Sequence, residues 1–488
     1  MTASSAKRNL PDDDAQPDSS SHSADRRSRG KGSRTQQQQP LSAFFRTKPS
    51  KSAGKADIGK ASSNASGEVQ WREIGGTWIG KWGSPAPAPK LATFDLDGTL
   101  ICVKGKGRFP KDSDDWRFFH PEVPQVLRRM HQQGYRIVII SNQNGLRPSK
   151  GVTGLSKRAM EFRLKISKIS SQLNVPFTIL VATLKDYMRK PSPGMWHLAQ
   201  QENDDLAIGT TGSFFVGDAA GRLAGWKRGA VADFSDSDLA FALNAGVPFY
   251  TPEEVFTEEI CSKAEPLPLA PQQNWSINRF SPRELAEPGN AHKELMGAIK
   301  KQVEKAAAAK VGLLVMLVGP PACGKSTFAV NDLEPLGFLR VNMDELKTRK
   351  RCEDAVRHAL KTNACVVIDN TNPDTAARSA FVRIAGEHGA SCIAVVFEHG
   401  SRDLAIHNNN YRAQLVQARH FSRLGRNSQT QRGAVPDCSD RVPDVAYHSY
   451  FKRFVLPESS EGFSIVLHHS FVPRFSSEED KQLWNQYY

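Results

Sequence analysis

The segment Gly319–Ser326, Gly-Pro-Pro-Ala-Cys-Gly-Lys-Ser, restricts the fold of this chain more than any other stretch. It follows the apolar run Val311–Val318 and precedes a helix-compatible stretch, so it predicts a buried strand, a tight loop and a helix. Such a loop closes its backbone N–H groups round phosphates, and the helix N-terminus favours their negative charge. Lys325 is expected to reach the β- and γ-phosphates of a nucleotide, and Ser326 to coordinate Mg²⁺. The predicted nucleotide-binding residues are Gly319, Gly324, Lys325, Ser326 and Thr327.

A second polar motif, Asp95-Leu96-Asp97-Gly98-Thr99, follows the strand-like run Leu91–Phe94 in the first half of the chain. In an extended strand, residues two apart point to the same face, so both carboxylates are expected beside one substrate. One carboxylate of such a pair can attack phosphorus to give an aspartyl-phosphate. The other can protonate the leaving oxygen and later activate water. A nearby Mg²⁺ is expected because two anionic groups must meet.

Three later segments supply what this chemistry still needs. Ser141 ends another apolar run and can hydrogen-bond a phosphoryl oxygen, while Lys190 can neutralise the charge of the transition state. Asp218 can complete the metal site, with Asp233 or Asp238 in its outer shell. Taken singly, an Asp-x-Asp is often a helix cap and a Lys-Pro is usually a loop. All four motifs in this order, each after an apolar run, favour a phosphate-transfer site.

The second half carries three further candidates. Asp344 can take the proton from an incoming hydroxyl, or it can be the N-cap of a helix over Glu345–Lys350. Asp369 ends the apolar run Val366–Ile368 and can act as a second-shell acid of the magnesium site. Arg412 lies in a polar, helical stretch and can close over the phosphates, although a lone helix arginine is more often a solvated surface residue.

The order of apolar runs predicts two α/β domains. Strand-like runs at Leu91–Asp97, Ile137–Ser141 and Phe214–Asp218 alternate with helical patterns such as Pro124–Gln133 and Ser156–Leu173. A Pro-rich stretch, Glu265–Pro271, separates them from a second alternation that starts at Leu313. We therefore expect two doubly wound parallel-sheet domains, at residues 71–263 and 291–488. They are preceded by a tail at 1–70 and joined by a linker at 264–290.

Composition narrows the partners. The chain has 488 residues and a net charge of +14, and such a positive excess attracts nucleic acid or an anionic membrane. No run approaches the ~20 apolar residues that a bilayer crossing needs, so nucleic acid is favoured. The 7 cysteines lack paired spacing, which indicates reduced thiols and gives no zinc pattern. Residues 1–70 are polar and are expected to be disordered.

The first half resembles the haloacid-dehalogenase superfamily and, more narrowly, the phosphatase half of polynucleotide kinase 3′-phosphatases. The resemblance implies that Asp95 is the nucleophile, that Asp97 is the general acid and base, and that Asp95, the Asp97 carbonyl and Asp218 hold Mg²⁺. The family often has Thr where this chain has Ser141, and the hydroxyl is kept. The matching segments are Phe94–Leu100, Ser113–Trp116, Asn142-Gln143, Val181–Thr183, Lys190–Trp196 and Val216–Arg222.

Residues 311 to 465 resemble the kinase half of the same family, through Asp369–Asp374 and the pattern His407-Asn408-Asn409-x-x-Arg412. The resemblance implies that Asp344 is the base and that Arg412 is a lid residue. One departure concerns the residue before Asp344, which is usually Arg in the family and is Met343 here. A contact to the 5′ end is then lost or supplied elsewhere. Animal relatives also carry a forkhead-associated domain, which residues 1–70 are too polar to form.

We therefore expect a monomeric, nuclear enzyme of DNA-end repair, which removes 3′-phosphates and phosphorylates 5′-hydroxyl ends with ATP and Mg²⁺. A second hypothesis moves the same chemistry to RNA ends, although no ligase-like domain is attached. A third is an end-binding scaffold with vestigial sites, which predicts missing catalytic groups. Asp95, Asp97, Lys190, Asp218, Lys325, Ser326 and Asp344 are all present.

The polar tail holds one apolar motif, in which Gln38, Leu41, Phe44 and Phe45 match the pattern Gln-x-x-Leu-x-x-Phe-Phe. This pattern resembles the peptide by which replication and repair proteins dock on the sliding clamp. A single 3₁₀ turn brings Leu41 and Phe44 to one side, where they can enter one pocket. Chance is the alternative, because short motifs recur in Gln-rich tails. The basic cluster at 26–31 indicates nuclear import or simply a solvated basic tail.

Overall fold

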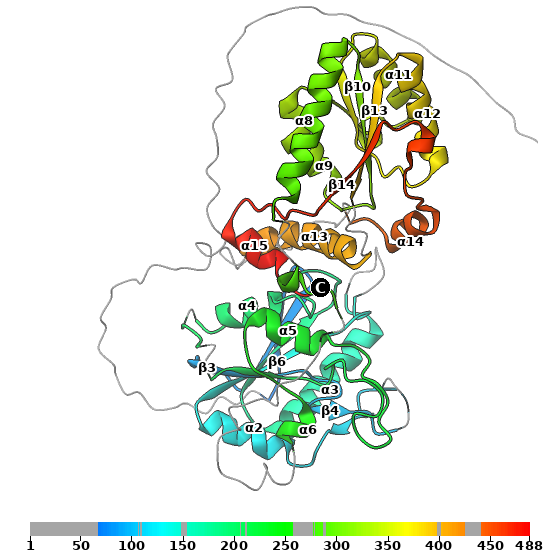
Figure 1. Ribbon diagram of the computed structural model, residues 1–488. Coiled ribbons are helices and arrows are strands. Elements are labelled where there is room, and N and C mark those ends of the chain that lie inside the picture. Colours follow the sequence, from blue (N-terminus) through cyan, green and yellow to red (C-terminus); the bar gives the residue numbers. More distant parts are fainter. Residues whose placement is uncertain are drawn as a thin grey trace, which may run out of the picture. The chain divides into compact units, whose positions relative to one another are not determined.

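The structure, a computed structural model, describes residues 67–256 and 277–488, except for gaps at 106, 108–109, 148–153, 205, 210–211, 278, 286–288, 398–401 and 425–440. Its strands form a seven-stranded sheet, a five-stranded sheet and a two-stranded ribbon (Figure 1). The basic cluster at 26–31, the motif at 38–45 and the Pro-rich stretch at 265–271 lie outside the described residues. Among the described helices, none combines the length and apolar character that a membrane crossing needs.

The seven-stranded sheet has the order β1-β2-β7-β6-β3-β8-β9. Its five strands from β7 to β9 run parallel, whereas β1 and β2 extend the β7 edge antiparallel. The central strands are apolar along their whole length because helices cover both faces of a parallel sheet. The strands are β1 (Gln70–Ile74), β2 (Thr77–Trp82), β3 (Lys90–Phe94), β6 (Tyr135–Asn142), β7 (Phe177–Ala182), β8 (Phe214–Val216) and β9 (Phe249–Tyr250), and the ribbon is β4 (Ile101–Cys102) with β5 (Arg117–Phe118).

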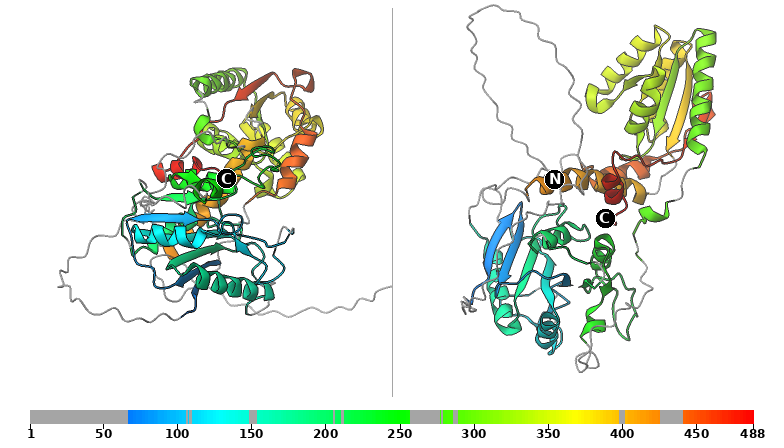
Figure 2. Two further views of the ribbon diagram at one scale, coloured as in Figure 1. Left: turned by 90° about the horizontal axis from the view of Figure 1, so that it is seen from below. Right: turned by 90° about the vertical axis from the view of Figure 1, so that its left-hand side faces the viewer.

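Helices cover both faces of this sheet, as Figures 1 and 2 show. Helices α2 (Val123–Gln132) and α3 (Lys157–Leu173) pack on one face, in a core that includes Phe94 and Ile139. Helices α4 (Gly194–Gln201) and α5 (Ser237–Ala245) pack on the other, in a core that includes Leu91 and Ile140. Successive side chains of a strand point to opposite faces, so each central strand contributes to both cores. The short helix α6 (Pro252–Val255) follows β9.

The five-stranded sheet is parallel throughout and has the order β11-β12-β10-β13-β14. All six residues of the central strand β10 are buried. Leu314, Met316 and Val318 point to one core, whereas the residues between them point to the other. The strands are β10 (Leu313–Val318), β11 (Leu339–Val341), β12 (Cys365–Ile368), β13 (Ser391–Phe397) and β14 (Ile465–His469).

Helices α8 (Ala291–Ala309) and α9 (Lys325–Phe328) pack on one face of this sheet, and α11 (Arg349–Leu360) and α12 (Thr375–Glu387) on the other. The remaining helices connect or follow these layers. They are α10 (Met343–Leu346), α13 (Arg402–Leu424), α14 (Asp444–Arg453) and α15 (Glu478–Trp484).

The expectation of two doubly wound parallel sheets is confirmed. The strand predicted within the apolar run Val311–Val318 is β10, and the predicted helix over Ser156–Leu173 is α3, with Ser156 as its N-cap. The antiparallel strands β1 and β2 were not expected from the sequence. The domain boundaries proposed at 71–263 and 291–488 stay predictions.

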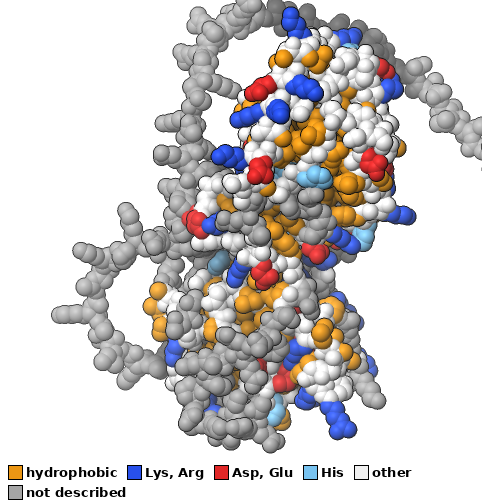
Figure 3. Space-filling view, viewed as in Figure 1, with side chains coloured by type: hydrophobic (Ala, Val, Ile, Leu, Met, Phe, Trp, Pro, Cys, Tyr) orange, Lys and Arg blue, Asp and Glu red, His pale blue; other side chains and the backbone are white. Residues whose placement is uncertain are grey.

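Among the described side chains visible in Figure 3, Lys and Arg are distributed among apolar and polar ones. The net charge of +14 therefore does not by itself mark a nucleic-acid-binding face on that side of the molecule.

Candidate active sites

Asp95 directly follows strand β3 and lies in a buried position, 7% exposed. The Lys190 Nζ atom lies 2.5 Å from Asp95 Oδ1 and 2.7 Å from Asp238 Oδ1. Burial lowers the pKa of Lys190, but Asp238 and Asp95 outweigh that effect and hold this pKa above its usual range. A charged lysine thus lies between two carboxylates, where it can also meet the negative charge of a phosphoryl group.

Three carboxylates gather at this point. One oxygen each of Asp95, Asp218 and Asp238 lies within 4.8 Å of the others. Burial, only partly offset by Lys190, raises the pKa of Asp95 to about 7. Burial and the neighbouring Asp95 and Asp238 raise the pKa of Asp218 to about 8. Such crowding of oxygen ligands suits a hard divalent cation, so the residues present fit the Mg²⁺ expected here.

Gly98 allows Asp218 to approach the Asp95 loop. A Cβ atom on Gly98 would lie 2.3 Å from Asp218 Oδ2, and the residue has a φ of +92°, in the left-handed region that favours glycine. The glycine of the Asp-x-Asp-Gly-Thr motif is therefore required by the close approach of Asp218.

Asp97 has different partners from Asp95. Its side chain is 47% exposed, it accepts a hydrogen bond from Gln143 Nε2 at 2.5 Å, and the Lys165 Nζ atom lies 3.3 Å from its Oδ1 atom. Leu96 is fully buried between the two aspartates, so polar and apolar side chains alternate as the spacing predicts, although the regular strand ends at Phe94. Asp97 is thus the accessible carboxylate of the pair, as proton exchange with substrate and water requires.

The end of β6 holds the lysine segment in place. Ser141 is buried and accepts a hydrogen bond from Gln143 Nε2 at 2.9 Å. The Asn142 side chain donates to the Lys190 carbonyl and accepts from its N–H, both at 3.0 Å. Ser141 therefore lies beside the Gln143 amide, which also contacts Asp97. Asn142 positions the backbone of Lys190.

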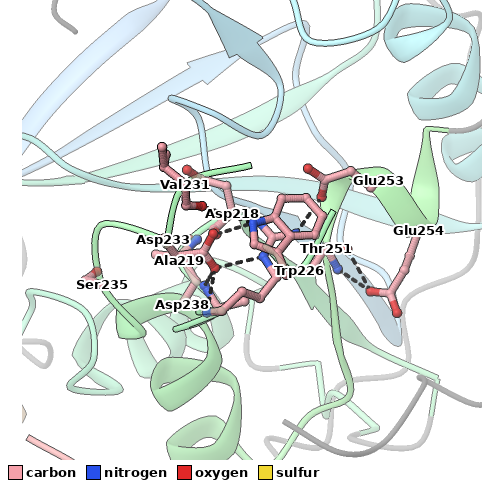
Figure 4. A network of polar contacts seen from close by, with 12 residues as sticks. Asp218, Ala219, Trp226, Val231, Asp233, Ser235, Asp238, Thr251, Glu253 and Glu254 are labelled. Atoms are coloured by element: carbon pink, nitrogen blue, oxygen red, sulfur yellow. Dashed lines mark hydrogen bonds and ion pairs between the residues drawn. The ribbon is translucent and has the colours of Figure 1, made fainter. Parts of the chain in front are cut away.

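Asp233 and Asp238, the two candidates for the outer shell of the metal site, have different partners in and near the loop after Asp218 (Figure 4). Asp238 accepts a hydrogen bond from the Ala219 N–H at 3.1 Å, in addition to its contact with Lys190. Asp233 instead pairs with Arg222 at 2.8 Å, and Arg222 also contacts Glu253 at 3.0 Å. Asp238 thus belongs to the carboxylate cluster, whereas Asp233 fixes the loop that follows it.

The glycine-rich segment forms the loop predicted between β10 and α9. Gly324 has a φ of +97°, and a Cβ atom on Gly319 would lie 2.7 Å from Cys323 Sγ. Lys325 is 7% exposed and donates to the carbonyl oxygens of Gly319 at 3.0 Å and Pro320 at 2.6 Å. Its ammonium group is therefore held inside the loop, where the phosphates of a nucleotide are expected.

A cavity of about 370 Å³ opens on this loop. Arg412, from α13, lies in its wall, as its predicted role over the phosphates requires. Asn408, one turn earlier, donates to the Ala322 carbonyl at 3.2 Å and so connects α13 to the loop. Gly324, Lys325, Ser326 and Thr327 line the cavity together with the aromatic residues Phe471, Phe475 and Trp484.

Asp344 lies in the first turn of α10 and is exposed. The N-cap of this helix is Asn342, whose side chain accepts from the N–H groups of Asp344 at 2.8 Å and Glu345 at 3.3 Å. The alternative of Asp344 as the cap is therefore wrong, because Asn342 already accepts those hydrogen bonds. The Asp344 carboxylate is left for another role.

Asp369 is 2% exposed and supports the Asp344 turn. Its carboxylate lies 2.7 Å from Arg340 and accepts from the Asn342 side chain at 3.1 Å. These contacts show that Asp369 holds β11 and the α10 cap, and its second-shell role at a magnesium site stays a prediction.

Lys165 and Asn408 are site residues that sequence reasoning missed. Lys165 lies in the middle of α3, where a lysine in an amphipathic pattern is usually a solvated residue. The motif His407–Arg412 contains Asn408, but the motif alone does not indicate a contact with the phosphate loop. The hydrogen bonds that reveal both roles join residues 68 and 86 positions apart.

The two sheets and their sites define an enzyme with two phosphate chemistries, an Asp-x-Asp phosphatase and a P-loop kinase. The family model for polynucleotide kinase 3 phosphatase matches residues 90–256, and that for an AAA domain matches residues 314–424. The bifunctional polynucleotide phosphatase/kinase of Schizosaccharomyces pombe is 33% identical over 417 residues, covering 84% of this chain and 93% of that protein. The polynucleotide 3′-phosphatase ZDP of Arabidopsis thaliana is 35% identical over 183 residues, covering 34% of this chain and 24% of that protein.

This chain therefore belongs to the family of bifunctional polynucleotide phosphatase/kinases.

Proposed function

We propose that this chain prepares broken DNA strands for ligation, by removing 3′-phosphates and by phosphorylating 5′-hydroxyl ends from ATP. The observation that carries the proposal is the contact of Lys190 with Asp95 and Asp238 in one half, in a chain whose other half holds a complete phosphate loop. The family membership supports both activities.

In the phosphatase reaction, an Asp95 oxygen attacks phosphorus and the bond to the 3′-oxygen breaks. Asp97 gives its proton to that leaving oxygen. Asp97 then takes a proton from the water that hydrolyses the aspartyl-phosphate, which releases inorganic phosphate and restores Asp95. Lys190 neutralises charge on the phosphoryl group throughout, because its ammonium lies 2.5 Å from the nucleophile. Ser141 supplies the hydroxyl near the phosphoryl oxygens.

Asp95, Asp218 and the Asp97 carbonyl would hold Mg²⁺ in the phosphatase, and Ser326 in the kinase. When bound, the cation supplies positive charge that lets an anionic carboxylate or a nucleotide meet an anionic phosphate. Asp238 orients Lys190 and the Ala219 N–H beside this site.

In the kinase reaction, the phosphates of ATP take the place of the loop carbonyls that now accept from Lys325. Asp344 takes the proton of the 5′-hydroxyl while that oxygen forms a bond to the γ-phosphorus and ADP leaves. Arg412, in the cavity wall, stabilises the charge that develops.

We propose DNA rather than RNA as the substrate because the motif Gln38–Phe45 resembles the peptide that docks on the sliding clamp. The sliding clamp is a protein that encircles DNA. The test compares kcat/KM of both activities on strands of identical sequence in DNA and in RNA. Higher values on DNA support the proposal, whereas higher values on RNA would favour the healing of RNA ends. A folded chain that binds ends without turnover would favour a scaffold.

The tail is proposed to bind the sliding clamp through Gln38, Leu41, Phe44 and Phe45, and to direct the chain to the nucleus through its basic cluster. Clamp affinity is expected at about micromolar Kd, a common range for short peptides that order on binding. Calorimetry of the full chain with its own organism's clamp tests this. Phe44→Ala with Phe45→Ala should abolish the heat and leave both activities intact.

A further inference from the structure

Lys347 ends helix α10 in an unusual backbone conformation. Its φ of +68° places it in the left-handed region, which favours glycine. A helix that ends this way usually has Gly at that position. This conformation does not by itself mark a function, because Lys310 also ends a helix in the left-handed region.

The Lys347 side chain folds back over the turn that carries the proposed base. Its Nζ atom donates to the Asp344 carbonyl at 2.5 Å. The residue as a whole is exposed to solvent. Its hydrogen-bond partner is a neutral carbonyl, so this contact leaves the positive charge available to a ligand.

Two neighbouring arginines, Arg340 and Arg349, contact other groups of the chain. Arg340 lies 2.7 Å from Asp369 and 2.5 Å from Glu345. Arg349 donates to two carbonyl oxygens of α12 and lies 3.1 Å from Glu353. Met343, directly before Asp344, is 45% exposed and carries no charge.

A nucleic acid end needs a cation at this point. The phosphodiester that follows the terminal nucleoside is anionic, and the carboxylate of Asp344 on this short helix repels it. We propose that Lys347 contacts this phosphodiester and so positions the 5′-hydroxyl beside Asp344. The inference rests on the proposed kinase function and identifies a substrate-positioning residue of that site.

The chain offers a matched control at Lys310. This lysine also ends a helix in the left-handed region, with a φ of +54°, and it is exposed. It follows α8 and precedes β10, so it lies at the start of the strand whose other end carries the phosphate loop. Glycine adopts the left-handed conformation without strain at position 347 and at position 310. A loss of kinase activity in either variant is therefore not explained by a destabilised fold.

The experiment uses the full chain and measures kinase kinetics on a 5′-hydroxyl DNA strand. Lys347→Gly should raise KM for the strand by about tenfold and lower the slope of log KM against log salt by about one, the effect of one lost phosphate contact. Its kcat and its KM for ATP should stay within about twofold of wild type. Lys347→Arg should restore most of the strand affinity, and Lys310→Gly should change none of these values.

An unchanged KM for Lys347→Gly would overturn the inference, as would an equal rise for Lys310→Gly or no rescue by Lys347→Arg. The 3′-phosphatase rate of each variant on the same strand should equal that of wild type. A wild-type chain that does not phosphorylate 5′-hydroxyl strands would instead refute the proposed function, so the two failures are distinguishable.

Discussion

The phosphatase and kinase sites differ in how much of each is assembled before substrate arrives. In the phosphatase, the proposed nucleophile Asp95 is buried and already contacts its cationic partner, Lys190, at 2.5 Å. In the kinase, the proposed base Asp344 is exposed on a four-residue helix, and Lys325 donates to its own loop. A preorganised site stabilises its transition state with little rearrangement. The kinase must instead exchange internal contacts for contacts with ATP and the 5′ end.

The largest expected effect is that of Asp95→Asn, which keeps the shape of the nucleophile and removes its charge. Phosphate release from 3′-phosphorylated DNA should fall by at least about 10³-fold, since the covalent step is lost. Phosphorylation of a 5′-hydroxyl strand should be unchanged in the same preparation. Substantial residual phosphatase activity would mean that another group attacks phosphorus.

The next effect is that of Asp344→Asn. If Asp344 is the base, the kinase kcat should fall by roughly 10²–10⁴-fold, the usual contribution of positioned proton transfer. Binding of ATP, measured separately by titration, should change little because the phosphate loop is intact. Weaker ATP binding with an unchanged kcat would identify Asp344 as a structural residue.

A smaller effect is expected from Gly98→Ala, which tests how tightly the phosphatase site is built. The added Cβ atom would lie 2.3 Å from Asp218 Oδ2 and would displace that carboxylate. A shift of about 1 Å at such a site can lower the rate about 10²-fold. Kinase activity of the variant provides the control. Normal phosphatase kinetics would show that the carboxylate cluster tolerates movement.

The smallest expected effect is a change of thermal stability with pH. The pKa of Asp95 is raised to about 7 and that of Asp218 to about 8, from an ordinary value of 3.8. A raised folded-state pKa contributes stability that is complete below the unfolded-state value and is lost as pH rises through the folded value. Without Mg²⁺, stability should therefore fall between about pH 4 and pH 8.

Mg²⁺ should oppose this loss, because it replaces the protons that the carboxylates share. At pH 8 we expect saturating Mg²⁺ to raise Tm by about 3 °C, and at pH 5.5 by much less. Calorimetry at both pH values measures the difference, and Asp218→Asn should reduce it. An equal rise at both pH values would argue against a cation bound at this cluster.

Much of both sites could be predicted because their residues follow strands. Asp95, Ser141 and Asp218 each end an apolar run, and parallel strands bring their carboxyl ends to one edge of the sheet. The loop Gly319–Ser326 is encoded locally, so its prediction needed no knowledge of distant contacts.

The remaining features depend on packing between distant segments. Lys165 reaches Asp97 only because α3 packs against the sheet, and the helix alone gives no sign of it. Asn342, rather than Asp344, caps α10 because its side chain also bonds Asp369 across two strands. The edge strands β1 and β2 are ordered by pairing with β7, which lies about 100 positions further along the chain.

We propose that this one chain makes both ends of a DNA break ready for ligation at two independent sites. The most direct measurement is sealing of a nicked duplex with 3′-phosphate and 5′-hydroxyl ends by an added DNA ligase that requires both repaired ends. Wild type should allow sealing, and neither Asp95→Asn nor Lys325→Ala should do so alone. Their mixture should restore sealing, because each variant keeps the site that the other lacks. A mixture of the two folded variants that cannot restore sealing, or a wild type that leaves the nick open, would contradict the account.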